Sequence, residues 1–249
     1  MISGTMFFLE VSVSERIVGI LIEGFQKILV ASIQVTIPLT ILGFFFAMVI
    51  ALFMAMVQYA NVPVLKQIAR FYIWIFRGTP LLVQLFLAYF GLPKIGITMS
   101  AFPCAVLVFS LNEGAYCSET MRAALEAVPS GQMEAGYCAG MNYLQIMFHV
   151  VLPQALRTAF PPLSNSLISM LKDTSLAAEI TVADMFMSAQ KIVGRTYEPL
   201  WVYAEVALIY LVFSTILTII QKRWEKRLNT YNSRSEDNPG KKEREVVQP

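Results

Sequence analysis

Long runs of apolar residues alternate with short polar segments along most of the chain. Four runs are long enough to cross about 30 Å of hydrocarbon as helices that rise about 1.5 Å per residue. They cover residues 30–57, 71–90, 102–121 and 201–220. Apolar runs of about 18 or more residues are rare in soluble cores, so the pattern predicts an all-α membrane protein.

A fifth predicted span, residues 155–171, is more polar and contains Pro161, Pro162 and Asn165. A polar helix with prolines survives at membrane depth only where neighbouring helices or water satisfy its backbone. We therefore expect five transmembrane helices, with this one inside the bundle and lining a pathway.

Composition supports the membrane interpretation, since 56% of the 249 residues are hydrophobic and 14% are charged. The net charge of +2 gives no reason to expect a nucleic-acid partner. Cys104, Cys117 and Cys138 are odd in number and scattered, and His149 is the only histidine. Neither a disulfide framework nor a metal site is expected.

Five spans place the two termini on opposite sides of the membrane. With the C-terminus inside, most of the 19 lysine and arginine residues lie on the cytoplasmic side, in agreement with the positive-inside rule. Residues 1–24 are then a short external segment, residues 25–228 the transmembrane domain, and residues 229–249 a disordered cytoplasmic tail. Residues 132–154, between the spans at residues 102–121 and 155–171 (the third and fourth in chain order), lie in the cytoplasm.

The cytoplasmic segment 132–154 is polar, contains glycines and is compatible with a helix. Leu144, Met147 and Val151 fall at i, i+3 and i+7 and are expected to form one apolar stripe. Gly140 permits a sharp turn or a close backbone approach, and Pro153 fixes the entry into the next span. The residues alone leave two interpretations open: a connector that lies on its own bundle, or a docking surface for another protein.

Polar residues in and near the spans supply a candidate solute pathway. A charge at membrane depth costs about 2.5 to 3.5 kcal/mol unless it faces a cavity or a partner. A zwitterionic amino acid needs acceptors for its ammonium group and donors for its carboxylate. Internal hydrogen bonds, and helix capping by Asp173 or Thr174, are the alternatives. The candidate pathway residues are Asn112, Glu113, Asn165, Ser166, Asp173, Thr174 and Ser175.

Two further features concern charges near helix ends. Glu119 and Arg122 are three residues apart on one helix and are expected to pair. Arg77 lies beside Gly78 and Pro80, which loosen the second span, and is expected to act either as an interfacial anchor at a kink or as part of a gate.

Four ordered blocks resemble the membrane permease subunits of bacterial ATP-binding cassette importers. Glu134-Ala135, Gly140 and Leu152-Pro153 are similar to the EAA loop of that family, with Gly136 where a second alanine is usual. The other blocks resemble its polar amino-acid branch, and residues 161–166 with 172–178 look most like cystine permeases. The similarity covers about residues 25–228, and the other blocks are residues 76–84, 114–122 and 171–177.

The resemblance implies that the cytoplasmic segment forms a coupling helix seated in a cleft of a separate ATPase subunit. It also implies an external solute-binding protein, a second permease subunit that is identical or homologous, and a multi-pass location in the bacterial plasma (inner) membrane. ATP and Mg are expected in the partner ATPase and no cofactor in this chain. The coupling residues that it implies are Glu134, Ala135, Gly136, Gly140, Leu144, Met147, Leu152 and Pro153.

No enzymatic activity is expected of this chain. Gly131 and Gly136 have the glycine spacing of a phosphate-binding loop, but Tyr137 and Cys138 follow where lysine and serine or threonine are needed. The expected function is a permease that moves polar L-amino acids, with cystine as the specific candidate, by alternating access. An ion-coupled secondary transporter or channel is the alternative, and it would not need the block at residues 134–153.

Overall fold

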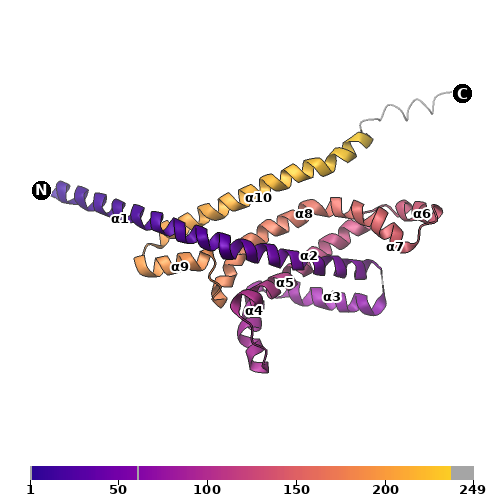
Figure 1. Ribbon diagram of the computed structural model, residues 1–249, viewed down its shortest axis with the longest axis horizontal. Helices are drawn as coiled ribbons and strands as arrows, with labels where there is room; N and C mark the ends of the chain where they lie inside the picture. The colour runs from indigo at the N-terminus through magenta and orange to yellow at the C-terminus, as the bar shows by residue number, and fades with distance from the viewer. Residues whose placement is uncertain (1, 61, 237–249) are drawn as a thin grey trace.

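The computed structural model describes residues 2–60 and 62–236, and this part of the chain is almost entirely helical and contains no β-strand (Figure 1). α1 (Ile2–Ala31), a π-helical turn η1 (Ser32–Thr36) and α2 (Ile37–Tyr59) form one continuous helix. Its residues 15–59 are a candidate membrane span of 45 residues. The first predicted span lies inside it, and the expected external segment is helical from Ile2 onward.

The described chain contains three π-helical turns, and each closes immediately before a proline. Proline offers no N–H to the carbonyl four residues earlier, and its ring crowds that carbonyl. A wider turn, closed by a hydrogen bond to the carbonyl five residues back, relieves this crowding. In η1 the N–H of Ile37 closes the turn and Pro38 follows. In η2 (Leu87–Gly91) these residues are Leu92 and Pro93, and in η4 (Met147–Val151) they are Leu152 and Pro153.

The apolar run predicted as one helical span over residues 71–90 is not a continuous helix, because it breaks in the middle. α3 (Pro63–Gly78) meets the helical arm formed by α4 (Leu81–Phe86), η2 and η3 (Leu92–Ile95) at an angle of 104°. Thr79 is extended, with φ −124° and ψ 145°. The ring of a proline disfavours the helical conformation of the residue before it, and Thr79 takes the extended alternative, so the helix ends before Pro80.

α5 (Ala101–Glu126) is the central helix and packs chiefly against α2. Ala51 and Ala55 of α2 are fully buried and lie in one cluster with Cys117 of α5. Gly114 of α5 approaches α2 so closely that a methyl group there would lie 3.0 Å from Cγ2 of Ile50. Small residues at the contact therefore allow the two backbones to come together, as is common between membrane helices.

α8 (Leu152–Asp173) packs on α5 and on α10 (Pro199–Glu236), with Pro161 and Pro162 inside it. η5 (Thr174–Ile180) and α9 (Met185–Thr196) connect these two helices. α10 contains the predicted span 201–220. It also continues past residue 228, where the tail was expected to begin, and residues 237–249 lie outside the described residues.

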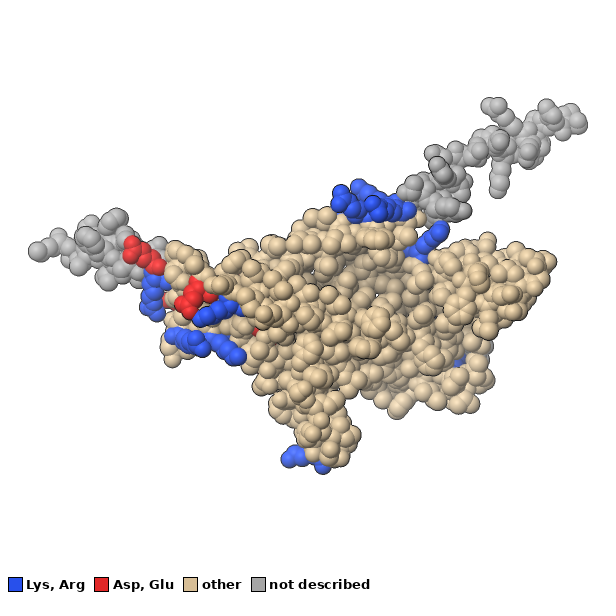
Figure 2. All heavy atoms as spheres, viewed as in Figure 1, with Lys and Arg blue, Asp and Glu red and all other residues tan. Residues whose placement is uncertain are grey.

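Within the described residues, two helical segments, Glu15–Tyr59 and Pro199–Leu228, are each long and apolar enough to cross a membrane, and the bent α3–α4 pair makes three if it counts as one span. α5 and α8 cover the other two predicted spans but are too polar to meet the same criterion. Figure 2 shows charged side chains near the two ends of the molecule and at the tip of the α4 arm. The middle of this face is almost free of charge, as suits a surface that lies in hydrocarbon.

Asp184, which precedes α9, is a buried carboxyl group in the connection between α8 and α10. It is 0% exposed, and its Oδ1 accepts a hydrogen bond of 2.8 Å from the N–H of Met187. Its Oδ2 has no hydrogen-bond partner among the described residues. Burial raises the pKa of Asp184 from 3.8 to about 6. Between these two pH values the folded protein holds a proton that the unfolded chain has lost, so the unfolding free energy falls as the pH rises through this window.

Asp184→Asn is expected to keep the cap of α9 and to remove this pH dependence. Relative to the wild type, the variant should gain on the order of 1 to 3 kcal/mol of stability as the pH rises from 3.8 to about 6, and no more above that. Thermal unfolding of the purified chain in detergent across the window measures this difference. Asp184→Ala, which also loses the cap, should be about 1 kcal/mol less stable than Asp184→Asn. Equal pH slopes for Asp184→Asn and the wild type would contradict the prediction.

Candidate functional site

Side-chain amides hold the break between α3 and α4 by replacing backbone hydrogen bonds. In an unbroken helix the Phe76 carbonyl would accept from residue 80, but Pro80 has no N–H. Nε2 of Gln84 donates to this carbonyl at 2.9 Å, and Nδ2 of Asn112 donates to it at 3.2 Å. Asn112 also donates to Oε1 of Gln84 at 3.0 Å. Asn112 thus joins α5 to the break, so the internal hydrogen bonding weighed for it from the sequence is present.

A cavity of about 590 Å³ lies where this break, α5 and α8 meet, and we call it the central cavity. Its volume is in the range of about 300 to 1,000 Å³ that is usual for small-molecule sites. Asn112, Glu113, Asn165, Ser166 and Asp173 line it, so the structure brings together five of the seven residues predicted for a pathway. The other polar side chains in its wall belong to Thr79, Tyr116, Thr120 and Ser169.

Thr79, Tyr116, Thr120 and Ser169 were not among the seven predicted pathway residues, although Ser169 belongs to the span expected to line a pathway and helical periodicity could have found the last three. Glu113, Tyr116 and Thr120 follow one another at i, i+3 and i+7 on α5. Ser169 follows Asn165 by four residues on α8. Polar residues at these spacings share one face of a helix, and in both helices that face is turned to the central cavity.

Two carboxyl groups make the central cavity acidic. Among the described residues that line it, none is lysine or arginine. Oε1 of Glu113 accepts a weak hydrogen bond from Sγ of Cys117 at 3.4 Å, and Ser166, which also lines the cavity, is a second hydrogen-bond partner of Glu113. Asp173 ends α8, and its side chain makes no capping hydrogen bond to η5. Because the C-terminal end of a helix is itself a negative pole, this part of the wall favours an ammonium group.

Thr174 and Ser175 do not join the central cavity. Thr174 is fully buried, and its hydroxyl donates to the Leu171 carbonyl at 2.6 Å. The hydroxyl of Ser175 donates to the Lys172 carbonyl at 2.8 Å. Ser175 instead lines a separate cavity together with Lys172 and Tyr210. The polar sequence at residues 172–175 is therefore divided between two sides of the chain.

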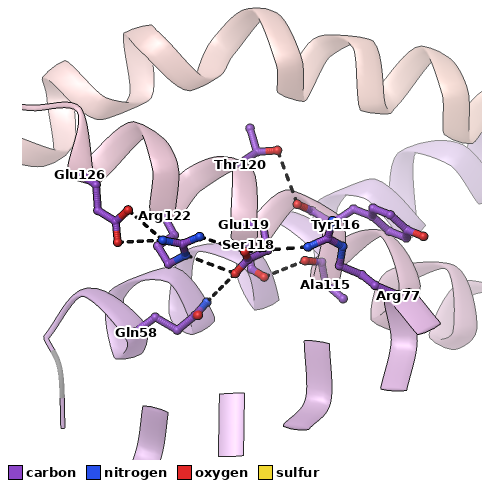
Figure 3. Close-up of polar contacts among 9 residues, drawn as sticks. All are labelled: Gln58, Arg77, Ala115, Tyr116, Ser118, Glu119, Thr120, Arg122 and Glu126. Carbon is purple, nitrogen blue, oxygen red and sulfur yellow. Dashed lines mark hydrogen bonds and ion pairs between the residues drawn. The ribbon is translucent and has the colours of Figure 1, made fainter. Parts of the chain in front are cut away.

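A charged network next to the central cavity ties three helices together around Glu119 (Figure 3). Arg122 donates to Glu119 at 3.0 and 3.3 Å and to both oxygens of Glu126 at 2.8 Å. Gln58 of α2 donates to Glu119 at 3.3 Å, and Arg77 of α3 pairs with it at 3.8 Å. The predicted pairing of Glu119 with Arg122 is confirmed, and it is one part of a larger cluster.

Arg77 connects this network to the wall of the central cavity. Its guanidinium carbon lies 5.3 Å from the centre of the Tyr116 ring, and Tyr116 lines the cavity. Arginine over an aromatic face is attracted by the ring quadrupole. Arg77 therefore bridges α3 and α5 at the edge of the cavity, a position compatible with either the anchor or the gate considered from the sequence.

The segment 132–154 folds as α6 (Ser130–Cys138), a turn at Gly140, and α7 (Tyr143–Ile146), followed by η4 and α8. Gly140 has φ +79°, a conformation that favours glycine, so the sharp turn predicted there is confirmed. Asn142 and Gln145 form a capping box, in which each side chain accepts from the backbone N–H of the other at 2.9 Å. The segment is a compact pair of short helices.

The residues expected to couple to an ATPase divide between two sides of this segment. The prediction of one apolar stripe is wrong, because Leu144 is 61% exposed whereas Met147 and Val151 are 2% and 0% exposed. Met147 and Val151, at the two ends of η4, pack in one buried cluster, whereas Leu144 lies in α7 before this turn and faces outward. The exposed members of the set are Glu134, Ala135, Gly140, Leu144 and Pro153, and the buried ones are Gly136, Met147 and Leu152.

Gly136 packs against Ile146 and holds α6 against α7. A Cβ atom at position 136 would lie 2.6 Å from Cγ1 of Ile146, which is fully buried. Gly136→Ala is therefore expected to destabilise the protein by about 1 to 3 kcal/mol, although alanine normally stabilises a helix relative to glycine. Thermal unfolding in detergent measures the change.

Two variants separate this clash from a general effect of the substitution. Gly131→Ala, in the same helix with nothing within 4 Å of the new methyl group, should be neutral or slightly stabilising. In a protein that already carries Ile146→Ala, adding Gly136→Ala should change the stability little, because the two sites share one contact. Additive losses in the double variant would count against the contact.

Comparison with known proteins gives consistent matches over most of the chain. The family model described as "Binding-protein-dependent transport system inner membrane component" matches residues 43–230. The L-cystine transport system permease protein TcyB of Bacillus subtilis is 46% identical over 210 residues, 84% of this chain and 90% of that protein. The L-cystine transport system permease protein TcyL of the same organism is 37% identical over 221 residues, 86% of this chain and 92% of that protein. A solved structure, described as an amino acid ABC transporter with histidines, is 32% identical, with a TM-score of 0.71 over 89% of this chain and 98% of that chain.

Proposed function

Because this chain belongs to the family of inner-membrane components of binding-protein-dependent transport systems, and is the permease component of an amino-acid importer of the ATP-binding cassette class, we propose that it carries L-cystine by alternating access. The resemblance described from the sequence blocks is confirmed at the level of the family. The observation that carries the proposal of cystine is the central cavity, with its two carboxyl groups and its wall of hydroxyl and amide groups.

Cystine carries two ammonium and two carboxylate groups around a disulfide. Glu113 and Asp173, which lie on different helices of the cavity wall, supply one acceptor for each ammonium group. Asn165, Ser166 and the hydroxyl of Tyr116 supply donors for the carboxylates. Two anionic groups without a cation in the wall select a solute with two ammonium groups over one with a single ammonium group.

We place five spans in the bacterial inner membrane, with the N-terminus outside, the C-terminus inside and residues 132–154 in the cytoplasm. The broken α3–α4 pair then serves as the second span, and α5 and α8 form the polar interior. Residues 132–154 dock on a separate ATPase that binds ATP and Mg. A second permease subunit completes the path, and an external solute-binding protein delivers the substrate. These assignments rest on the family and on the exposed apolar side chains of Tyr137, Leu144 and Phe148.

Uptake of labelled cystine by the reconstituted importer, with its ATPase and binding protein, tests the proposal. ATP-dependent accumulation of cystine, inhibited by unlabelled cystine more strongly than by glutamine, histidine or arginine, is the expected result. Strong uptake of glutamine without uptake of cystine would refute the substrate. The alternative of an ion-coupled transporter predicts uptake that persists without ATP and follows an imposed ion gradient.

A further inference from the structure

A second polar cavity, of about 300 Å³, lies at the end of the bundle that carries α6, and we call it the corner cavity. It shares no lining residue with the central cavity. Lys66, Arg70 and Trp74 of α3 form one wall. The facing wall contains Gln58 of α2 and the cluster of Glu119, Arg122 and Glu126 of α5.

The carboxyl groups of the corner cavity are already engaged. Arg122 lies between Glu119 and Glu126 and donates to both (Figure 3). Within the described chain, the guanidinium of Arg70 makes no hydrogen bond or ion pair, although it is exposed in the cavity and carries a full positive charge. With Lys66 beside it, the cations in the wall outnumber the carboxylates, and the charge in excess attracts an anion.

α3 sorts its side chains by face in a manner typical of a helix at a membrane surface. Lys66, Arg70 and Arg77 fall at i, i+4 and i+11 and share one face. Val64, Ile68, Phe71 and Trp74 are 67%, 58%, 61% and 70% exposed and belong to the opposite side and its edge. Exposed apolar side chains next to a cationic stripe match the boundary between acyl chains and headgroups.

We propose that the corner cavity binds the headgroup of an anionic phospholipid, with the acyl chains along the exposed apolar face of α3. Arginine presents several N–H donors in a planar fork that matches the oxygens of a phosphodiester. Basic pockets between membrane helices are common sites for such headgroups. The exposed apolar side of α3, which reaches the corner cavity at Trp74, favours a lipid over a free phosphate ion, because a free ion would leave that side unused.

Trp74 supplies a reporter for the test, since it lines the corner cavity and the chain has only 3 tryptophans. In full-length protein with Trp201→Phe and Trp224→Phe, its fluorescence is followed in nanodiscs that contain brominated phosphatidylglycerol or brominated phosphatidylcholine. Brominated phosphatidylglycerol should quench Trp74 at a lower mole fraction than brominated phosphatidylcholine does. The expected difference is about fivefold for each cation that contacts the headgroup, since one such contact contributes about 1 kcal/mol. The preference should weaken at high ionic strength.

Charge variants decide whether Arg70 is the contact. Arg70→Gln should lower the preference for phosphatidylglycerol about fivefold, and Arg70→Lys, which keeps the charge but not the fork, should lower it less. Lys94→Gln, on the α4 arm, should leave it unchanged. Equal quenching by the two lipids, or an unaltered preference in Arg70→Gln, would overturn the proposal. Reversal of the quenching by soluble glycerol phosphate at the same concentration as the lipid would also overturn it, by showing that a free anion is sufficient.

Discussion

Gly140→Asp should reduce ATP-driven uptake about tenfold or more while leaving the amount of permease in the membrane unchanged. Gly140 has φ +79° in the turn between α6 and α7, and nothing lies within 4 Å of a Cβ atom placed there. A residue with a Cβ atom pays about 1 to 2 kcal/mol at this φ, with aspartate at the lower end, and 1.4 kcal/mol is a factor of ten in a binding equilibrium. The turn would change its shape, and the segment would lose its fit to the ATPase.

The measurement combines uptake in reconstituted vesicles with capture of the ATPase by immobilised permease. Gly131→Asp is the matched control, because it adds the same charge to α6, one residue before the segment, at a glycine without positive φ. It should retain capture and uptake. The docking role of residues 132–154 fails if Gly140→Asp imports substrate as the wild type does.

Asp173→Asn should raise the substrate concentration for half-maximal uptake about tenfold with little loss of maximal rate. The substitution keeps the shape of the side chain and removes one of the two negative charges of the central cavity. A hydrogen bond to a charged group contributes about 1.5 to 3 kcal/mol, so its loss weakens binding about tenfold or more. Asn165→Ala, which removes a donor from the same cavity, should have a similar but smaller effect.

Ser175→Ala is the control for Asp173→Asn, since it lies two residues away but lines a different cavity. Its uptake kinetics should equal those of the wild type. Unchanged half-saturation in both Asp173→Asn and Asn165→Ala would refute binding of substrate in the central cavity. This outcome would leave the family and the coupling role of residues 132–154 intact.

The hydrophobic pattern predicted the helical class and the positions of most helices, because every long apolar run is helical, although the run at residues 71–90 is divided between two helices. The pattern could not reveal the break at Pro80, since the residues on both sides are equally apolar. Whether a proline kinks or ends a helix depends on what satisfies the freed carbonyl. Here Gln84 and Asn112 do so, and Asn112 comes from another helix. This hydrogen bond between two helices forms only in the folded bundle, so no local sequence pattern predicts it.

The sequence indicated which polar residues suit a solute pathway, but not which of them line the same cavity. Asp173, Thr174 and Ser175 are adjacent in the sequence and equally suited to a polar solute. The chain leaves the α-helix for η5 at this point, and only Asp173 faces the central cavity. Leu144 and Met147 show the same limit in residues 132–154. The two residues lie three positions apart, yet Leu144 is exposed and Met147 is buried, so helical spacing alone does not tell which of them the core covers.

The wide turns before Pro38, Pro93 and Pro153 have a consequence for how related chains differ in length. Each turn accommodates one residue more than an α-helical turn, and it is needed only while the proline follows it. A relative that has lost one of these prolines should also lack one residue just before it, with the rest of the helix in register. Gaps of one residue at these three points would then record lost prolines and not a change in the packing of the helices.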